Sequence, residues 1–160
     1  MAFRPANQHH IAIRMVPKNQ PYWRSGERAK LFTNKINGYW YATLGAGPLR
    51  QGCNGVLVSD INRYTDVREP PSFPVRRLAV PQEAEDDKIG LLLNRDSNYR
   101  DDLPYACLPD IPFSDNTYNS NGYAHGLLNA AGIEAQLPVG GGYFVGWTKP
   151  VPSSQFDPHP

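Results

Sequence analysis

The sequence predicts an α+β fold, in which an antiparallel sheet from the first half of the chain packs against helices from the second half. Two observations lead to this prediction. Segments of alternating apolar and polar residues lie in the first half, where an Asn37-Gly38 dipeptide is a strong signal for a hairpin turn. Segments with apolar residues at helical spacing come later, one after Pro81 and one near residue 120.

The chain length favours a single domain. A chain of 160 residues fits one domain over residues 1–160, with looser order expected for 1–8 and for about 150–160. The 16 prolines and 14 glycines are more than usual, so we expect short elements joined by many ordered loops.

The first half contains the strand patterns. Each predicted strand has β-branched or aromatic residues and is bounded by turn residues. In the second arm of the hairpin, Trp40, Ala42 and Leu44 share one face, whereas Tyr41 and Thr43 share the other. The predicted strands are His9–Val16, Lys30–Ile36, Tyr39–Leu44 ending at Gly45–Pro48, Gly55–Val58 and Val75–Val80.

Two helices are predicted in the second half, after a proline-rich connector at residues 68–74. The first, over about 83–99, has acidic residues in its first turn and leucines later, as the helix dipole favours. The second runs from about Asn121 to Ala131 and ends at Gly132. The tail contains at most one short strand, near residues 143–147, after Gly140-Gly141-Gly142.

Charge and hydropathy exclude several functions. The net charge of +1 gives no basic surface for nucleic acid, and no apolar run is long enough to span a membrane. The N-terminus has no apolar core of a classical signal peptide, so we expect a cytoplasmic protein or export without a cleavable signal. Cys53 and Cys107 are expected as two reduced thiols, with one disulfide as the alternative outside the cell.

No metal or cofactor site is expected. The adjacent His9 and His10 point to opposite faces of a strand, so they do not readily bind one metal together. The Gly45-Ala46-Gly47-Pro48 run matches no phosphate-binding loop, and no GxSxG nucleophile motif is present.

The remaining candidate chemistry is a serine nucleophile with a histidine base. Ser120 lies at the start of the second helix, where free N–H groups around Asn121 and Gly122 could stabilise an oxyanion. His10 on the first strand would accept the serine proton. Polar residues on or after the neighbouring strands are candidates for the third, orienting group: Thr43, Tyr41, Asp60 and Asn62.

A purely structural explanation stands beside this one. Asn119, Ser120 or Asn121 would each make a good N-cap, worth about 1 kcal/mol. His125 is a helical neighbour of Asn121, and Cys107 is a competing nucleophile that no helix start follows.

Two motifs resemble the circularly permuted papain-like proteins, a group that includes relatives of the NlpC/P60 peptidases and of lecithin:retinol acyltransferase. The segment His10–Ile13 resembles their histidine strand. The segment Asn119–Tyr123 resembles their helix start, with Ser120 where that family has cysteine. The runs 41–48 and 118–132 also resemble small uncharacterised bacterial proteins found with toxin or secretion modules.

This resemblance implies a papain-like permuted topology and attack on an amide, ester or thioester carbonyl, in peptides, peptidoglycan or lipids. The resulting hypothesis is a hydrolase or acyltransferase with Ser120 and His10 as catalytic pair, acting as an effector on the bacterial envelope. The choice between His9 and His10 stays open on the residues alone. The alternative is a non-catalytic binding or structural module that keeps the papain-like fold, with a protein as a possible partner. Its candidate contact residues are aromatic: Trp23, Tyr39, Trp40 and Trp147.

Overall fold

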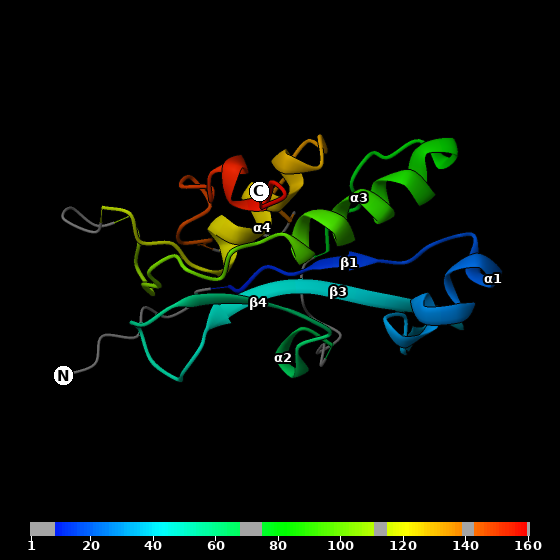
Figure 1. Ribbon diagram of the computed structural model, residues 1–160, viewed down its shortest axis with the longest axis horizontal. Coiled ribbons are helices and arrows are strands. Elements are labelled where there is room, and N and C mark those ends of the chain that lie inside the picture. Colours follow the sequence, from blue (N-terminus) through cyan, green and yellow to red (C-terminus); the bar gives the residue numbers. More distant parts are fainter. Residues whose placement is uncertain (1–8, 68–74, 111–114, 139–142, 160) are drawn as a thin grey trace.

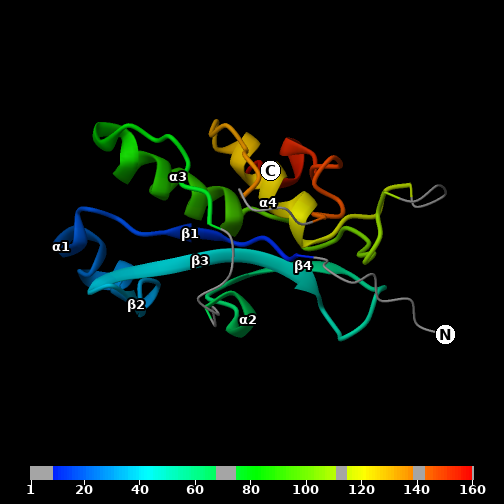
Figure 2. The ribbon, with the colours of Figure 1, turned by 180° about the vertical axis from the view of Figure 1, so that it is seen from behind.

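The computed structural model describes residues 9–67, 75–110, 115–138 and 143–159. A sheet forms one layer, and two helices, α3 (Glu85–Ser97) and α4 (Ser120–Ala130), cover one of its faces. The short helix α2 (Tyr64–Val67) lies against the other face, as Figure 1 and the reverse view in Figure 2 both show. The predicted α+β class is therefore confirmed.

The sheet is built around one long strand, β3 (Tyr39–Pro48), and all its pairings are antiparallel. Strand β1 (Ile13–Met15) pairs along one edge, with Ile13 opposite Leu44. Strands β2 (Asn34–Ile36) and β4 (Leu57–Ile61) both pair along the opposite edge of β3. Leu44 lies between Ile13 of β1 and Ile61 of β4, so these two strands are on opposite sides of β3, and the strand order places β2 on the side away from β1. Strand β1 is thus an outer strand of the sheet.

The predicted hairpin is present, but its first arm is shorter than the predicted Lys30–Ile36, because β2 begins at Asn34 and Lys30 belongs to a 3₁₀ turn. Asn37 and Gly38 both have positive φ angles, 48° and 84°, as a two-residue turn that matches strand twist requires. The expected end of the second arm was wrong, because β3 continues through Gly45 and Gly47 to Pro48 and pairs with β4 there. These glycines do not form a turn. They make room for the side chains of Asp66, in α2, and of Arg63, just before it.

Three other strand predictions need correction. Only Ile13–Met15 of the predicted first strand pairs with the sheet. Residues 75–80 form no strand, and the 55–58 strand is shifted to Leu57–Ile61. The predicted connector at 68–74 and the triple glycine at 140–142 lie outside the described residues.

Both long helices are close to their predicted positions. Helix α3 has acidic residues in its first turn and buries Ile89, Leu92 and Asp96. Helix α4 buries most of its length, including Tyr123 and Leu127, against β3. The shorter helical segments are α1 (Gln20–Trp23) and three 3₁₀ turns: Gly26–Lys30, Gln82–Ala84 and Ser153–Phe156. None of the helices described here is both long and apolar enough to cross a membrane.

The C-terminal segment belongs to the core, contrary to the expectation of loose order. Val151 and Phe156 are buried, and the Val151 N–H donates to the Gly122 carbonyl at 2.9 Å. The Phe156 ring stacks on Tyr99, with ring centroids 5.3 Å apart. The expectation for residues 1–8 lies outside the described residues.

The two cysteines form a disulfide, so the expectation of two reduced thiols was wrong. Cys53 is in the β3–β4 connection and Cys107 follows α3, 54 residues later. A backbone hydrogen bond of 2.8 Å from Leu57 N–H to the Leu103 carbonyl brings these two segments together. The disulfide also removes Cys107 from the candidate nucleophiles.

Candidate active site

The start of α4 is capped by Asn119. Its side-chain oxygen accepts hydrogen bonds from the N–H groups of Asn121 at 3.0 Å and Gly122 at 3.1 Å. Its amide nitrogen donates to the Val145 carbonyl at 2.8 Å. Of the three residues that could have capped this helix, Asn119 does so, and Ser120 is the first residue of the helix.

Asn121 attaches the helix to the open edge of the N-terminal segment. Its oxygen accepts a hydrogen bond from the Ile11 N–H at 2.8 Å, and its amide nitrogen donates to the His9 carbonyl at 2.9 Å. These bonds satisfy main-chain groups that an outer strand leaves unpaired. Asn121 therefore places the helix start beside His10, although 110 residues separate Asn121 from Ile11.

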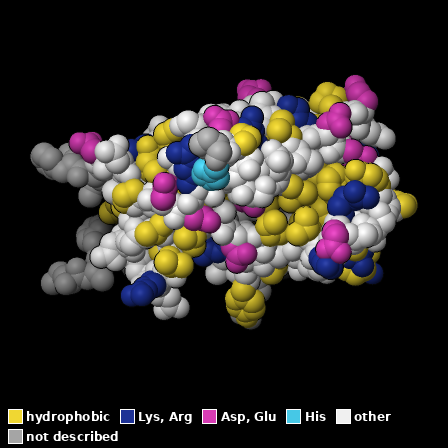
Figure 3. All heavy atoms as spheres, viewed as in Figure 1, with side chains coloured by type: hydrophobic (Ala, Val, Ile, Leu, Met, Phe, Trp, Pro, Cys, Tyr) yellow, Lys and Arg dark blue, Asp and Glu magenta, His cyan; other side chains and the backbone are white. Residues whose placement is uncertain are grey.

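Ser120 lies at a large groove that follows the outer strand, which we call the edge groove. The edge groove has a volume of about 1310 Å³ and is lined from β1, β3, α2, α3 and α4. Its lining includes polar residues and a glycine from these elements and the loops beside them: His10, Thr43, Gly47, Arg63, Asp66, Tyr105 and Ser120. On the face seen in Figure 3, hydrophobic side chains gather between the helical layer and the sheet.

The Ser120 hydroxyl is not used by the helix cap. Ser120 is 8% exposed, and its side chain makes no hydrogen bond with another described residue. The structural explanation of Ser120 as an N-cap therefore does not hold, because Asn119 fills that role.

His10 has a carboxylate partner that sequence reasoning missed. The His10 Nε2 atom lies 2.7 Å from Asp66 Oδ1, and the Asp66 side chain is fully buried whereas the His10 side chain is 37% exposed. A buried carboxylate on one ring nitrogen fixes the ring orientation and leaves Nδ1 as the nitrogen available to a substrate or nucleophile.

The Asp66 side chain has room against β3 because residue 45 of that strand is a glycine. A Cβ added at Gly45 would lie 2.1 Å from Asp66 Oδ2 and 3.6 Å from the Ala12 Cβ. Asp66, Ala12 and Gly45 therefore share one face of the sheet. Thr65 Oγ1 donates a second hydrogen bond to Asp66 Oδ1 at 3.0 Å, while Asp66 Oδ2 is buried without a partner.

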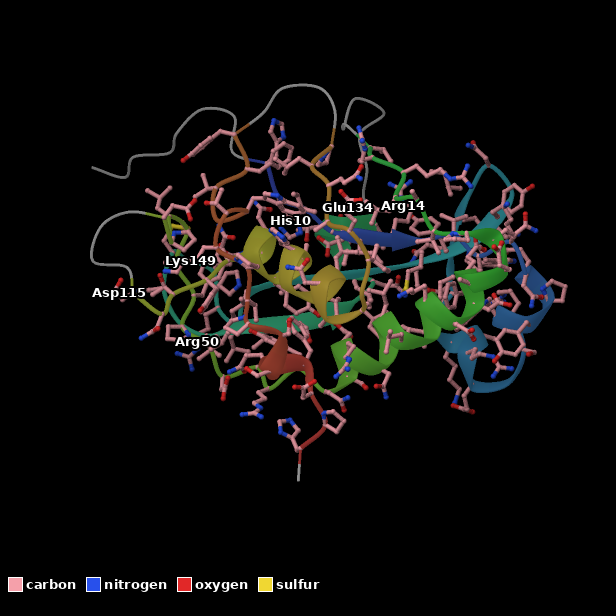
Figure 4. All side chains as sticks on the ribbon, turned by 90° about the horizontal axis from the view of Figure 1, so that it is seen from above. His10, Arg14, Arg50, Asp115, Glu134 and Lys149 are labelled. Atoms are coloured by element: carbon pink, nitrogen blue, oxygen red, sulfur yellow. A yellow bond between two sulfur atoms is a disulfide. The ribbon has the colours of Figure 1, made fainter. Side chains whose placement is uncertain are left out.

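Ser120 and His10 approach the outer strand from different sides. The Asp66 carboxylate that holds His10 is on α2, on the face of the sheet opposite α4 (Figures 1 and 2). Figure 4 shows His10 beside the start of α4, with Arg14 farther along β1. Both residues line the edge groove, and no hydrogen bond joins them in the described part of the chain.

None of the four candidates for the orienting group contacts His10 among the described hydrogen bonds. The Thr43 hydroxyl is buried without a partner. Asn62 accepts from the Thr43 N–H at 2.9 Å and donates to the Leu31 carbonyl at 2.6 Å, which makes it a structural residue. Tyr41 donates to the Val67 carbonyl at 3.4 Å, and Asp60 is exposed.

The expected oxyanion donors also need correction. The N–H groups of Asn121 and Gly122 already donate to Asn119 Oδ1, so they are not free to hold an oxyanion. The N–H of Ser120 forms no hydrogen bond with a described residue, which makes it the available donor at this helix start.

The other histidines have structural surroundings. The His9 ring lies against Phe144, with centroids 5.4 Å apart. His125 Nδ1 lies 2.7 Å from the Trp147 carbonyl, and the two rings stack. Among the contacts that the described residues make with these three histidines, only that of His10 is with a carboxylate, so the geometry favours His10 over His9.

The aromatic residues named for a binding module are mostly packed. Trp23 is buried and donates to Asp86 at 2.7 Å. Trp40 is covered by the cations of Arg24 and Lys35, whereas Tyr39 is 54% exposed. A contact surface built from all four is therefore not supported.

Within the described residues, no group of three or more His, Cys, Asp or Glu side chains is arranged to hold a metal ion. No model of a protein family matches the chain, and neither a curated protein nor a solved structure is significantly similar to it.

Proposed function

We propose that the protein is a serine hydrolase or acyltransferase that acts on an amide or ester carbonyl. The observation that carries this proposal is the His10–Asp66 pair, in which a fully buried carboxylate holds a partly exposed imidazole at 2.7 Å in the groove that contains Ser120. Imidazoles oriented in this way serve as general bases in acyl transfer.

In the proposed reaction, His10 Nδ1 takes the proton of the Ser120 hydroxyl as the serine oxygen attacks the substrate carbonyl. The Ser120 N–H stabilises the oxyanion, and protonated His10 then gives its proton to the leaving amine or alcohol. Water or an acceptor alcohol, deprotonated by His10, releases the acyl group from Ser120. Ser120 and His10 do not hydrogen-bond to each other here. The proposal therefore requires that they meet in the substrate complex, where hydrogen bonds that are long or poorly aligned in the free enzyme often tighten.

Asn119 and Asn121 have a positioning role in this proposal. Asn119 sets the start of α4, and Asn121 ties it to the chain on either side of His10. Thr43 is not assigned a chemical role, because its hydroxyl faces no partner.

The proposed setting is a bacterial effector that meets peptide, peptidoglycan or lipid carbonyls outside the cytoplasm. The Cys53–Cys107 disulfide supports an oxidising compartment, since cytosolic thiols are normally kept reduced. Of the two locations expected from the sequence, we therefore propose export over a cytoplasmic role.

Active-site labelling tests this function. A fluorophosphonate probe is expected to label the wild-type protein at Ser120, and Ser120→Ala is expected to abolish the labelling. His10→Ala and Asp66→Asn are each expected to slow it about 10²–10⁴-fold, because the base or its orientation is lost. Ser97→Ala is the matched control, since Ser97 is an exposed residue at the end of α3.

The contrary result would be equal labelling of wild type and Ser120→Ala, or of wild type and His10→Ala. Thermal unfolding of each variant shows whether a loss of labelling reflects a loss of fold. The second candidate, a binding module without catalysis, is favoured by the absence of a hydrogen bond between Ser120 and His10 in this structure. It predicts no labelling of folded wild-type protein.

A further inference from the structure

Arg63 lies directly against the backbone of β3. A Cβ added at Gly47 would come within 2.1 Å of Arg63 Nη1 and 2.5 Å of Nη2. No residue with a side chain at position 47 would leave the guanidinium where it is. Gly47 therefore provides the space for Arg63, as Gly45 does for Asp66.

The Arg63 guanidinium has N–H donors that no described residue accepts. Arg63 is half-buried and lines the edge groove, yet its side chain forms no hydrogen bond or ion pair with another described residue. Its positive charge acts on Tyr105: burial raises the pKa of that phenol, and Arg63 opposes the rise. A guanidinium carries five N–H donors in a planar fork that matches a carboxylate or a phosphate.

Arg63 lies on the same face of the sheet as the His10–Asp66 pair. Strands β1 and β3 pair Ile13 with Leu44, and the contact between the Ala12 and Gly45 positions continues this register. Extending the register by two more residues places His10 opposite Gly47, on the face where the Arg63 guanidinium lies. The cation and the imidazole thus occupy adjoining parts of one groove.

We propose that Arg63, together with the Tyr105 hydroxyl, binds an anionic group, a carboxylate or a phosphate, of the ligand that enters the edge groove. The identification of that ligand as the substrate rests on the proposed function, whereas anion binding itself does not. A substrate bound in this way would present its carbonyl beside an anchored negative charge.

Anion binding is measured by titrating ¹⁵N-labelled full-length protein with N-acetylglycine or with inorganic phosphate and following the Arg63 side-chain Nε–Hε signal. The signal is expected to shift in a saturable way, more strongly with the anion that the site prefers. Arg63→Gln lacks this signal, so its binding is followed through the backbone amide signals of the groove, such as that of Gly47. Binding is expected to weaken about 10–100-fold, the usual effect of losing a charge-assisted contact.

Two further variants separate the effect of the position of the Arg63 guanidinium from the effect of positive charge alone. Gly47→Ala keeps the charge but displaces the guanidinium, so it is expected to weaken binding in the same way as Arg63→Gln. Arg50→Gln removes the same charge from an exposed loop, well away from His10 in Figure 4, and is expected to leave binding unchanged.

The proposal is overturned if the Arg63 signal does not respond to either anion, if Arg63→Gln binds as tightly as wild type, or if Arg50→Gln weakens binding as much as Arg63→Gln does. If Arg63→Gln does not fold, the wild-type Arg63 signal and the Gly47→Ala variant decide the question. Anion binding without fluorophosphonate labelling would reject catalysis and keep the anion site. Labelling without anion binding would reject the anion site alone.

Discussion

Thr43 is a buried hydroxyl in the middle of the sheet, and the consequence of removing it can be predicted. The residue is 1% exposed, and its Oγ1 has no hydrogen-bond partner. Thr43→Val replaces this hydroxyl with a methyl group of similar shape and keeps the N–H that donates to Asn62. Because a buried unpaired polar group is unfavourable, we expect the variant to gain about 1 kcal/mol in unfolding free energy.

Urea denaturation of the wild type and Thr43→Val measures this gain. The exposed Thr33 is the control, and Thr33→Val is expected to change the unfolding free energy little. A clear loss of stability in Thr43→Val would mean that the hydroxyl makes a contact that the static structure does not contain. Fluorophosphonate labelling is expected to be unchanged, since Thr43 is not assigned to the chemistry.

At the scale of single residues, the sequence identified some of the site and missed its carboxylate. The Asn-Ser-Asn run marked the start of α4, because all three residues favour helix N-termini. The run did not reveal that Asn121 bonds to residues 9 and 11, since that contact spans more than 100 positions. Asp66 carried no local signal, because a lone Asp beside Thr65 resembles a surface residue until Gly45 is seen beneath it.

At the scale of elements, α3 and α4 each contain a glycine whose replacement by alanine tests how the helix packs. Gly126 of α4 faces the C-terminal segment, and an added Cβ would lie 2.3 Å from the Val151 carbonyl oxygen. Gly90 of α3 has no atom within 4 Å of an added Cβ. Alanine has a higher intrinsic helix propensity than glycine, by up to about 1 kcal/mol at each of these positions.

The two substitutions are therefore expected to have opposite effects. Gly90→Ala should raise the unfolding free energy by about 0.5–1 kcal/mol. Gly126→Ala should lower it by about 1–3 kcal/mol, because a backbone oxygen must move. Thermal unfolding followed by circular dichroism compares the two variants, and stabilisation by Gly126→Ala would show that the C-terminal segment does not pack on α4 as described.

Elements with strong local patterns were predicted well, and elements that depend on distant contacts were not. The Asn37-Gly38 hairpin and helix α3 follow from turn chemistry and from the helix dipole, which are local. The predicted end of β3 was wrong because its two glycines resemble a turn signal. In the structure they instead allow the side chains of Asp66 and Arg63 to lie close to the backbone of β3. The C-terminal segment has a proline-rich composition, and only the buried Val151 and Phe156 reveal its packing.

At the scale of the whole molecule, Asp96 joins α3 to α4 inside the core. The Tyr123 hydroxyl donates a hydrogen bond to the Asp96 carboxylate, and the Tyr123 ring packs against Tyr99 and Phe156. Burial raises the pKa of Asp96 from 3.8 to about 6, and the negative charges of Asp101 and Asp60 add to the rise. The hydrogen bond from Tyr123 opposes it without cancelling it.

This raised pKa makes Asp96 a source of pH-dependent stability. The folded protein holds the Asp96 proton up to about pH 6, while the unfolded chain releases it near pH 3.8, so the unfolded state binds fewer protons between these values. The stability that the protonated carboxyl contributes is complete below the unfolded pKa and is lost as the pH rises through about 6. The shift corresponds to about 3 kcal/mol in total.

Other carboxylates also titrate in this range, so the contribution of Asp96 is isolated by comparing the wild type with Asp96→Asn at each pH. The asparagine oxygen can still accept the Tyr123 hydrogen bond but cannot ionise. The unfolding free energy of the variant, relative to wild type, is expected to rise by about 2 kcal/mol between pH 4 and pH 7, most of the total of about 3 kcal/mol, and to stay constant above pH 7. Urea titrations at a series of pH values measure the difference, and the exposed Asp87→Asn, also on α3, is expected to show no such trend. A difference that is independent of pH would mean that Asp96 ionises in the folded protein as readily as in the unfolded chain.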